Sequence, residues 1–197
     1  DAVEHEVAEL AVAVAAARAE CVERLRAEMD VSHDPNSLFP AAGLSLAGWM
    51  EKAVREAPAI EVEDKYRGVL RASRERDRAA GRTLDGPHRS DLVLTHRIKD
   101  IPAAQASTGE RKALLVGVVI SHARLVAAMH GFAPVMLLDD VAAFLDAARR
   151  DALFDLLARF GAQVFMTGVD ESSFRALGKS AERFSVAPGK VLPMSGS

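Results

Sequence analysis

The sequence contains a single cysteine, no excess of positive charge and no apolar run that we expect to be long enough for a membrane. Cys21 is alone among the 197 residues, which excludes an internal disulfide and suits a reducing compartment. The formal net charge of -3 gives no general attraction to nucleic acid, so any DNA contact must come from a local patch. A bilayer-spanning helix needs roughly 20 apolar residues. We therefore expect a cytoplasmic protein without a membrane partner.

A complete phosphate-binding glycine loop is also missing. Gly178, Lys179 and Ser180 match the end of such a loop, but its first required glycine falls on Ser173, and the preceding residues look helical. The chain also starts at Asp1 within a helical pattern, without an initiator methionine and without the features of a signal peptide. These features indicate a trimmed or partial product with no Walker A loop.

Hydrophobic residues make up 49% of the chain, enough to form one large or two small domains. Helical spacing predicts an amphipathic helix over residues 2–29 and a polar helix over residues 63–82. We expect a helical lobe over residues 1–80, followed by an α/β part over residues 81–197. Alternation predicts short strands around Leu44–Leu46 and Leu92–Leu94. The predicted buried stripe of the first helix consists of Val3, Val7, Leu10, Val14, Ala17, Cys21, Leu25 and Met29.

The helix over residues 63–82 carries the most basic stretch of the chain. Its arginines could follow a DNA backbone, or they could form a solvated face that Glu75 and Asp77 partly balance. The next segment leaves a similar choice, because His88, Arg89 and Asp91 could lie beside a nucleotide or bond to the backbone of a turn. The candidate DNA-binding residues are Arg71, Arg74, Arg78 and Arg82.

A strand, helix, strand unit is the strongest structural signal. Four apolar residues, 135–138, predict a strand buried on both faces, and Asp146 and Gly161 are suited to begin and end the next helix. A second apolar run over residues 162–167 predicts a parallel partner strand. Ligands of open α/β sheets bind at the carboxyl ends of such strands.

Asp139 and Asp140 stand at that strand end. One carboxylate can hold Mg²⁺ while its neighbour accepts a proton from an attacking water, as phosphoryl transfer requires. The alternative is that both acids only leave the core and cap the following turn.

Ser107 and Glu110 form a capping box that predicts a helix start. Gly109 lowers helix stability there and suggests close approach of a ligand to the backbone. Free N–H groups, with Arg111 and Lys112 beside them, make an anion site, and plain capping is the alternative.

Three segments in this order resemble the RecF family, bacterial recombinational-repair ATPases of the ABC/SMC type. They are GRTLDGPHRSDL (81–92), ASTGERKALLVGVVISHARLV (106–126) and PVMLLDDVAAFLDAARR (134–150), with FMTGVD (165–170) as further support. The resemblance spans essentially the whole chain but only the carboxyl-terminal half of that family. It implies a partial P-loop fold of the ABC type: the parallel-sheet portion with Walker B, plus a mostly helical lobe.

The resemblance implies roles for individual residues. Asp139 would hold Mg²⁺ and Asp140 would be the catalytic base, although many ABC ATPases have Glu at the latter position. Leu145 and Asp146 resemble the D-loop at a dimer seam, and Gly168 stands where ABC transporters have a switch histidine. The signature residues, which would contact the γ-phosphate bound by another subunit, are Ser107, Thr108, Gly109, Glu110, Arg111 and Lys112.

The resemblance further implies ATP and Mg²⁺ as cofactors and a homodimer that forms on ATP binding. It implies single-stranded and gapped duplex DNA, RecR and RecO as partners, and recombinase loading in DNA repair, replication and the SOS response. Two alternatives remain. One is a non-catalytic module that binds DNA or protein; the other is a different SMC-like repair ATPase, against which the short helices argue.

Overall fold

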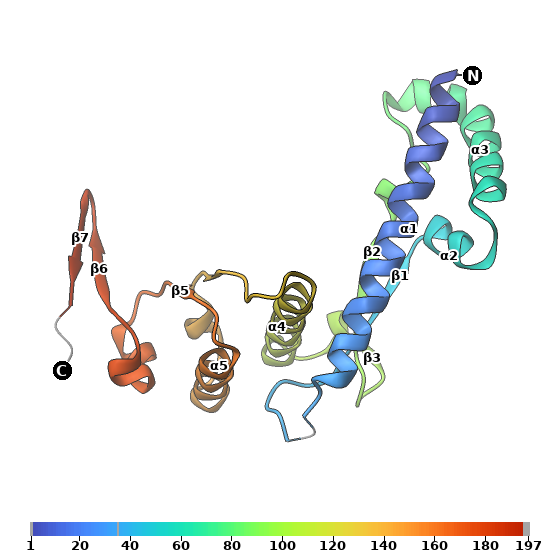
Figure 1. Ribbon diagram of the computed structural model, residues 1–197. Coiled ribbons are helices and arrows are strands. Elements are labelled where there is room, and N and C mark those ends of the chain that lie inside the picture. The colour runs from blue at the N-terminus through green and yellow to red at the C-terminus, as the bar shows by residue number, and fades with distance from the viewer. Residues whose placement is uncertain (1, 35, 195–197) are drawn as a thin grey trace. The chain divides into compact units, whose positions relative to one another are not determined.

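The computed structural model describes residues 2–34 and 36–194, which divide into two compact units (Figure 1). The first unit is Asp1–His33 with Ala41–Ala106, and the second is Asp34–Pro40 with Ser107–Ser197. The expected boundary after residue 80 therefore lies inside the first unit. The reason is strand pairing, since residues 42–47 are hydrogen-bonded to residues 91–96 in one sheet.

The first unit packs three helices with a small antiparallel sheet of order β1-β2-β3. The predicted helices and strands are present with slightly different ends, and Gly81 ends α3 in a left-handed conformation. Two short 3₁₀ turns, Pro87–Arg89 and Ala103–Gln105, flank the strands. The main elements are α1 Ala2–Val31, β1 Ala42–Ala47, α2 Trp49–Glu56, α3 Ala59–Ala80, β2 Asp91–His96 and β3 Ile101–Pro102.

Helix α1 buries a different face from the predicted one. Val3 is 73% exposed and Leu10 is 60% exposed. Small residues of α1 pack instead against Met50, Tyr66 and other side chains of α2 and α3, because alanines let helix backbones approach closely. Of the predicted stripe, only Leu25 belongs to the buried set, which is Ala8, Ala11, Val12, Ala15, Ala19, Val22 and Leu25.

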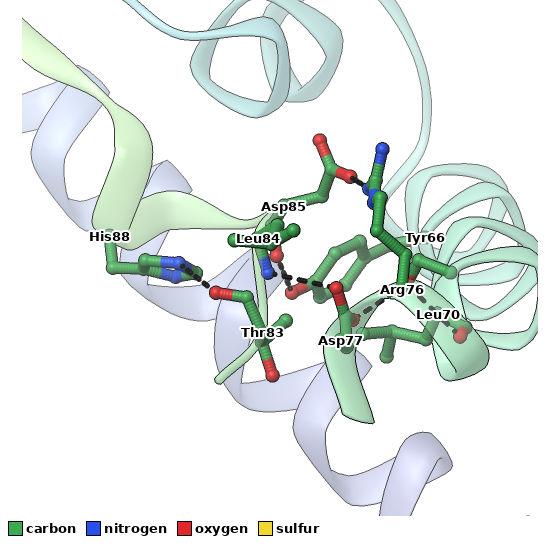
Figure 2. A network of polar contacts seen from close by, with 9 residues as sticks. Tyr66, Leu70, Arg76, Asp77, Thr83, Leu84, Asp85 and His88 are labelled. Carbon is green, nitrogen blue, oxygen red and sulfur yellow. Dashed lines mark hydrogen bonds and ion pairs between the residues drawn. The ribbon is translucent and has the colours of Figure 1, made fainter. Parts of the chain in front are cut away.

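The segment after α3 is held by hydrogen bonds to its own backbone (Figure 2). The Tyr66 hydroxyl donates to the Asp85 carbonyl at 2.8 Å, and the Leu84 amide donates to Asp77 Oδ1 at 3.1 Å. His88 Nε2 donates to the Thr83 carbonyl at 2.9 Å. These contacts favour the structural alternative for His88, whose ring holds a turn.

Replacing Tyr66 by phenylalanine should lower the free energy of unfolding by about 1 kcal/mol at neutral pH, because the Asp85 carbonyl loses its donor. Burial, followed by the charges of Asp85 and Asp77, raises the pKa of the Tyr66 hydroxyl. A raised pKa means that this stabilisation is present below the unfolded-state pKa of about 10 and is lost as pH rises through the folded-state value. Urea denaturation at pH 7 and above pH 10 measures both effects.

Thr83→Val is the matched control, because this exposed residue contributes its carbonyl and not its side chain to the turn. Equal unfolding midpoints for Tyr66→Phe and the unmodified chain would contradict the assignment.

The second unit contains the predicted strand, helix, strand motif. Strands β4 and β5 are parallel, with Leu137 opposite Phe165, and α5 connects them. Its core joins Ala113, Met136, Leu153 and Leu157 to Phe39, which comes from the short 34–40 segment. The elements are α4 Thr108–His130, β4 Met136–Leu138, the 3₁₀ turn η3 Val141–Phe144, α5 Ala147–Phe160, β5 Val164–Met166, the 3₁₀ stretch η4 Glu171–Ser180, β6 Phe184–Ala187 and β7 Lys190–Pro193.

Burial of β4 on both faces is a prediction that the structure corrects. Met136 and Leu138 pack into the core, whereas Leu137 is 76% exposed and Val135 is 57% exposed. Successive strand residues point to opposite faces, and within the described residues this parallel sheet has two strands with helices packed on the Met136 side.

Helix α4 is long and apolar enough to cross a membrane by length and composition alone, contrary to the expectation from the sequence. Ala113, Ile120 and Ala123 of this helix lie in the core of the second unit. One such helix is weak evidence for a membrane span, since the core helix of a soluble protein passes the same test, and 28% of the apolar window of α4 is buried within this structure. The Gly178–Ser180 sequence lies in η4, where Gly178 forms a kink and no strand precedes it directly.

Candidate nucleotide site

The two acids lie at the carboxyl end of β4, and one hydroxyl at the end of β5 contacts both. Thr167 Oγ1 donates a hydrogen bond to Asp139 Oδ1 and accepts one from the Asp140 amide at 3.0 Å. The Thr167 amide donates to the Leu138 carbonyl at 3.1 Å, which continues the strand pairing. Parallel strands end at the same edge of the sheet, so this edge gathers the polar groups.

Asp140 has an unusual backbone and an unpaired carboxylate oxygen. Its φ of 52° and ψ of 19° are left-handed, a region that residues other than glycine adopt rarely, although aspartate does so more often than most of them. Its Oδ1 atom is buried without a hydrogen-bond partner among the described residues. Asp140 precedes η3, but its side chain makes no capping hydrogen bond. The structure therefore gives no support to capping as the reason for Asp140.

The donor set fits a magnesium ion that is held together with phosphate oxygens. Asp139 is exposed, and an unpaired buried oxygen such as Asp140 Oδ1 is unfavourable unless an ion or donor completes it. No group of three or more His, Cys, Asp or Glu side chains gathers anywhere in the described part of the chain. Mg²⁺ usually takes one or two protein carboxylates, with phosphates and water as its other ligands, so the pair matches that pattern.

The start of α4 has the predicted capping box. The Glu110 amide donates to Ser107 Oγ at 3.3 Å, and the Ser107 amide donates to Glu110 Oε2 at 3.1 Å. A side chain at Gly109 would meet Arg149 Nη1 at 3.6 Å, which is ordinary contact. Packing inside this unit therefore does not require glycine at position 109.

The other signature side chains bond locally. Arg111 donates to Thr108 Oγ1 at 3.3 Å, and the Lys112 ammonium lies 4.4 Å from the centre of the Phe144 ring in η3. The Lys112 contact joins the start of α4 to the segment that follows the acids.

Asp146 caps α5, as predicted, while Leu145 is buried in the core. The Arg149 amide donates to Asp146 Oδ1 and the Arg149 guanidinium to Oδ2, both at 2.9 Å. These contacts, the backbone one first, lower the pKa of the Asp146 carboxyl. Arg149 Nε also donates to the Leu38 carbonyl at 3.3 Å, so one guanidinium joins the D-loop-like segment to residues 34–40.

The four arginines proposed for DNA fall into two pairs. Arg74 makes two hydrogen bonds to Glu4 of α1, at 2.5 and 2.6 Å, and Arg71 lies 3.9 Å from the same carboxylate. Arg78 and Arg82 are exposed, and neither has an ion pair within the residues that the structure covers. The first pair therefore has a structural partner, and the second pair is accessible to solvent.

Sequence reasoning missed two side chains of this region, Thr167 and Arg149. A signal for Thr167 was present, because a polar residue that ends a parallel strand next to two strand-end acids must lie close to them. No local sequence pattern predicted the hydrogen bond from Arg149 to the Leu38 carbonyl, because Leu38 is far away in sequence.

No protein-family model matches the chain. The DNA replication and repair protein RecF of Mesorhizobium japonicum is 51% identical to it over 193 residues, which are 98% of this chain and 51% of that protein. The RecF of Rhizobium meliloti is 53% identical over 190 residues, 96% of this chain and 50% of that protein. The chain thus spans about half the length of the curated relatives that it matches.

Solved structures of the recombination mediator protein RecF have the same fold. RecF-ATPrS superposes with a TM-score of 0.73 at 21% identity, over 98% of this chain and 49% of that one. RecF-ATP gives a TM-score of 0.71 at 20% identity, over the same 98% of this chain. Because curated relatives are about half identical over nearly all of its residues, the chain belongs to the RecF family.

Proposed function

We propose that the chain is the carboxyl-terminal half of a RecF-type ATPase and carries its paired acids and signature helix. The observation that carries this proposal is the buried, unpaired Oδ1 of Asp140, which lies beside the exposed Asp139 at the end of parallel strands. We use "complete protein" for this chain joined to a segment equivalent to the rest of its relatives. That segment would supply the Walker A loop, which is absent from this sequence.

In this proposal the two acids have different roles in ATP hydrolysis. ATP bound with Mg²⁺ would supply the reactive phosphoryl group, and Asp139 would hold the ion. Asp140 would orient a water molecule and accept its proton, a role that a positioned carboxylate can fill. Hydrolysis by the chain alone is not expected, because phosphoryl transfer depends on the phosphate cradle of the missing half.

The start of α4 would act on a nucleotide held by a second copy. The first amides of a helix carry partial positive charge and bind phosphate oxygens. Ser107 and Gly109 would lie against the γ-phosphate, and the remaining residues of the 107–112 segment would shape that tip. Asp146 would lie at the seam of a head-to-tail dimer that forms on ATP binding, and the buried Leu145 would anchor this segment to the core of its own unit.

The complete protein would bind single-stranded and gapped duplex DNA in the cytoplasm and promote recombinase loading with RecR and RecO. The relatives' description as DNA replication and repair proteins supports this proposal. Arg78 and Arg82 are the better candidates for phosphate contacts, because Arg71 and Arg74 already face Glu4.

The test is ATP-dependent dimerisation of the complete protein with Ser107→Arg. The long cation occupies the space of the phosphate and removes the helix cap, so ATP-dependent dimerisation should weaken by more than about tenfold. Sedimentation with and without ATP measures it. Ser185→Arg, which adds the same charge on the exposed β6 strand, is the control and should dimerise normally.

Dimerisation of Ser107→Arg at the level of the unmodified complete protein would refute the signature assignment. The capped helix would then be structural, and a non-catalytic binding module would be the better description.

A further inference from the structure

We infer that Thr167 is the positioning residue that gives Asp139 and Asp140 their different roles, an inference that rests on the function proposed above. Its hydroxyl is the one group that contacts both acids among the described residues. Thr167 belongs to neither the signature nor the acidic pair, and it reaches them from the end of β5.

The Thr167 hydroxyl makes a different kind of hydrogen bond with each of the two acids. A threonine hydroxyl has one proton to donate and lone pairs that accept. The proton goes to Asp139 Oδ1, and this hydrogen bond fixes the orientation of that carboxylate. A lone pair of the same oxygen accepts a hydrogen bond from the backbone amide of Asp140, so Thr167 donates no hydrogen bond to the Asp140 carboxylate. One carboxylate is thereby oriented, and the other keeps an oxygen without a donor.

The amide contact also holds the left-handed backbone of Asp140. A φ of 52° is uncommon for a residue other than glycine, and aspartate is one of the residues that adopt it. The bond from the Asp140 amide to Thr167 Oγ1 restrains this backbone, and the Oδ1 atom of the same residue is buried. Thr167 is itself placed by the bond from its amide to the Leu138 carbonyl.

The neighbouring Gly168 leaves no space for another side chain at this strand end. A Cβ at Gly168 would lie 2.7 Å and 2.8 Å from two ring carbons of Phe174, which stacks on Phe154 of α5. A substituent at position 168 would have to displace a packed ring. At the end of β5, the side chain that contacts the acids is therefore that of Thr167 and not one at position 168.

The test compares Thr167→Val with Thr167→Ser in the complete protein. Valine has the same shape without the hydroxyl, and position 167 is exposed, so the protein should stay folded with a thermal midpoint that falls by only a few degrees. Hydrogen exchange of peptides covering residues 138–145 should accelerate in Thr167→Val. The Mg²⁺ concentration for half-maximal binding of a fluorescent ATP analogue should rise by about tenfold or more, as for other residues that orient a ligand. Thr167→Ser keeps the hydroxyl and should restore both measurements.

Exchange and Mg²⁺ dependence like those of the unmodified protein in Thr167→Val would overturn the inference. A failure of the proposed function looks different, because the unmodified complete protein would then neither bind nor hydrolyse ATP. The exchange measurement without nucleotide would still report on the contact between Thr167 and Asp140.

Discussion

Asp140→Asn in the complete protein is expected to lower the turnover number for ATP hydrolysis by about 100- to 10,000-fold. The amide has the size of the carboxylate but cannot accept a proton from water. Asparagine also tolerates the left-handed backbone of this position, so the fold should be retained. Steady-state hydrolysis measures the turnover number, and binding of an ATP analogue should stay within a few-fold of normal.

Two variants control this experiment. Asp155→Asn removes an exposed carboxylate of α5 in the same unit and should leave hydrolysis unchanged. Asp139→Asn should act differently, by raising the Mg²⁺ concentration needed for nucleotide binding. Near-normal turnover of Asp140→Asn would exclude Asp140 as the base. The residue at this left-handed position would then have a structural role only.

Leu153→Ala is expected to lower the free energy of unfolding of the second unit by about 2–5 kcal/mol. Leu153 is 0% exposed and packs in the core that α4, α5 and β4 share with Phe39. Truncation removes buried apolar surface and leaves a cavity that a closely packed core fills only in part. Chemical denaturation followed by circular dichroism measures the loss.

Leu115→Ala provides the matched control, because Leu115 is also helical but is 59% exposed. Its cost should stay within about 0.5 kcal/mol, as for other surface substitutions. Similar losses from both substitutions would mean that the core assigned to the second unit is wrong.

Local signals were sufficient for most elements, for the two acids and for the capped start of α4. The caps at Ser107 and Asp146 and the left-handed Gly161 depend on neighbouring residues, so the sequence could predict them. Asp139 and Asp140 were found because they directly follow an apolar run. Thr167 was missed as a partner because it lies 27 residues from Asp140, and only the pairing of β4 with β5 brings them together.

The sequence by itself determined α1, α3, α4 and α5, the parallel motif and the position of the acids at a strand end, because periodicity and capping depend on residues a few positions apart. It did not predict α2. Tertiary structure alone decided which face of α1 is buried, since both its alanine and its valine faces are apolar. It also decided that Leu137 is exposed and that one threonine hydroxyl divides its contacts between two acids. Burial and hydrogen bonding across strands depend on which segments meet, and that is a property of the folded chain.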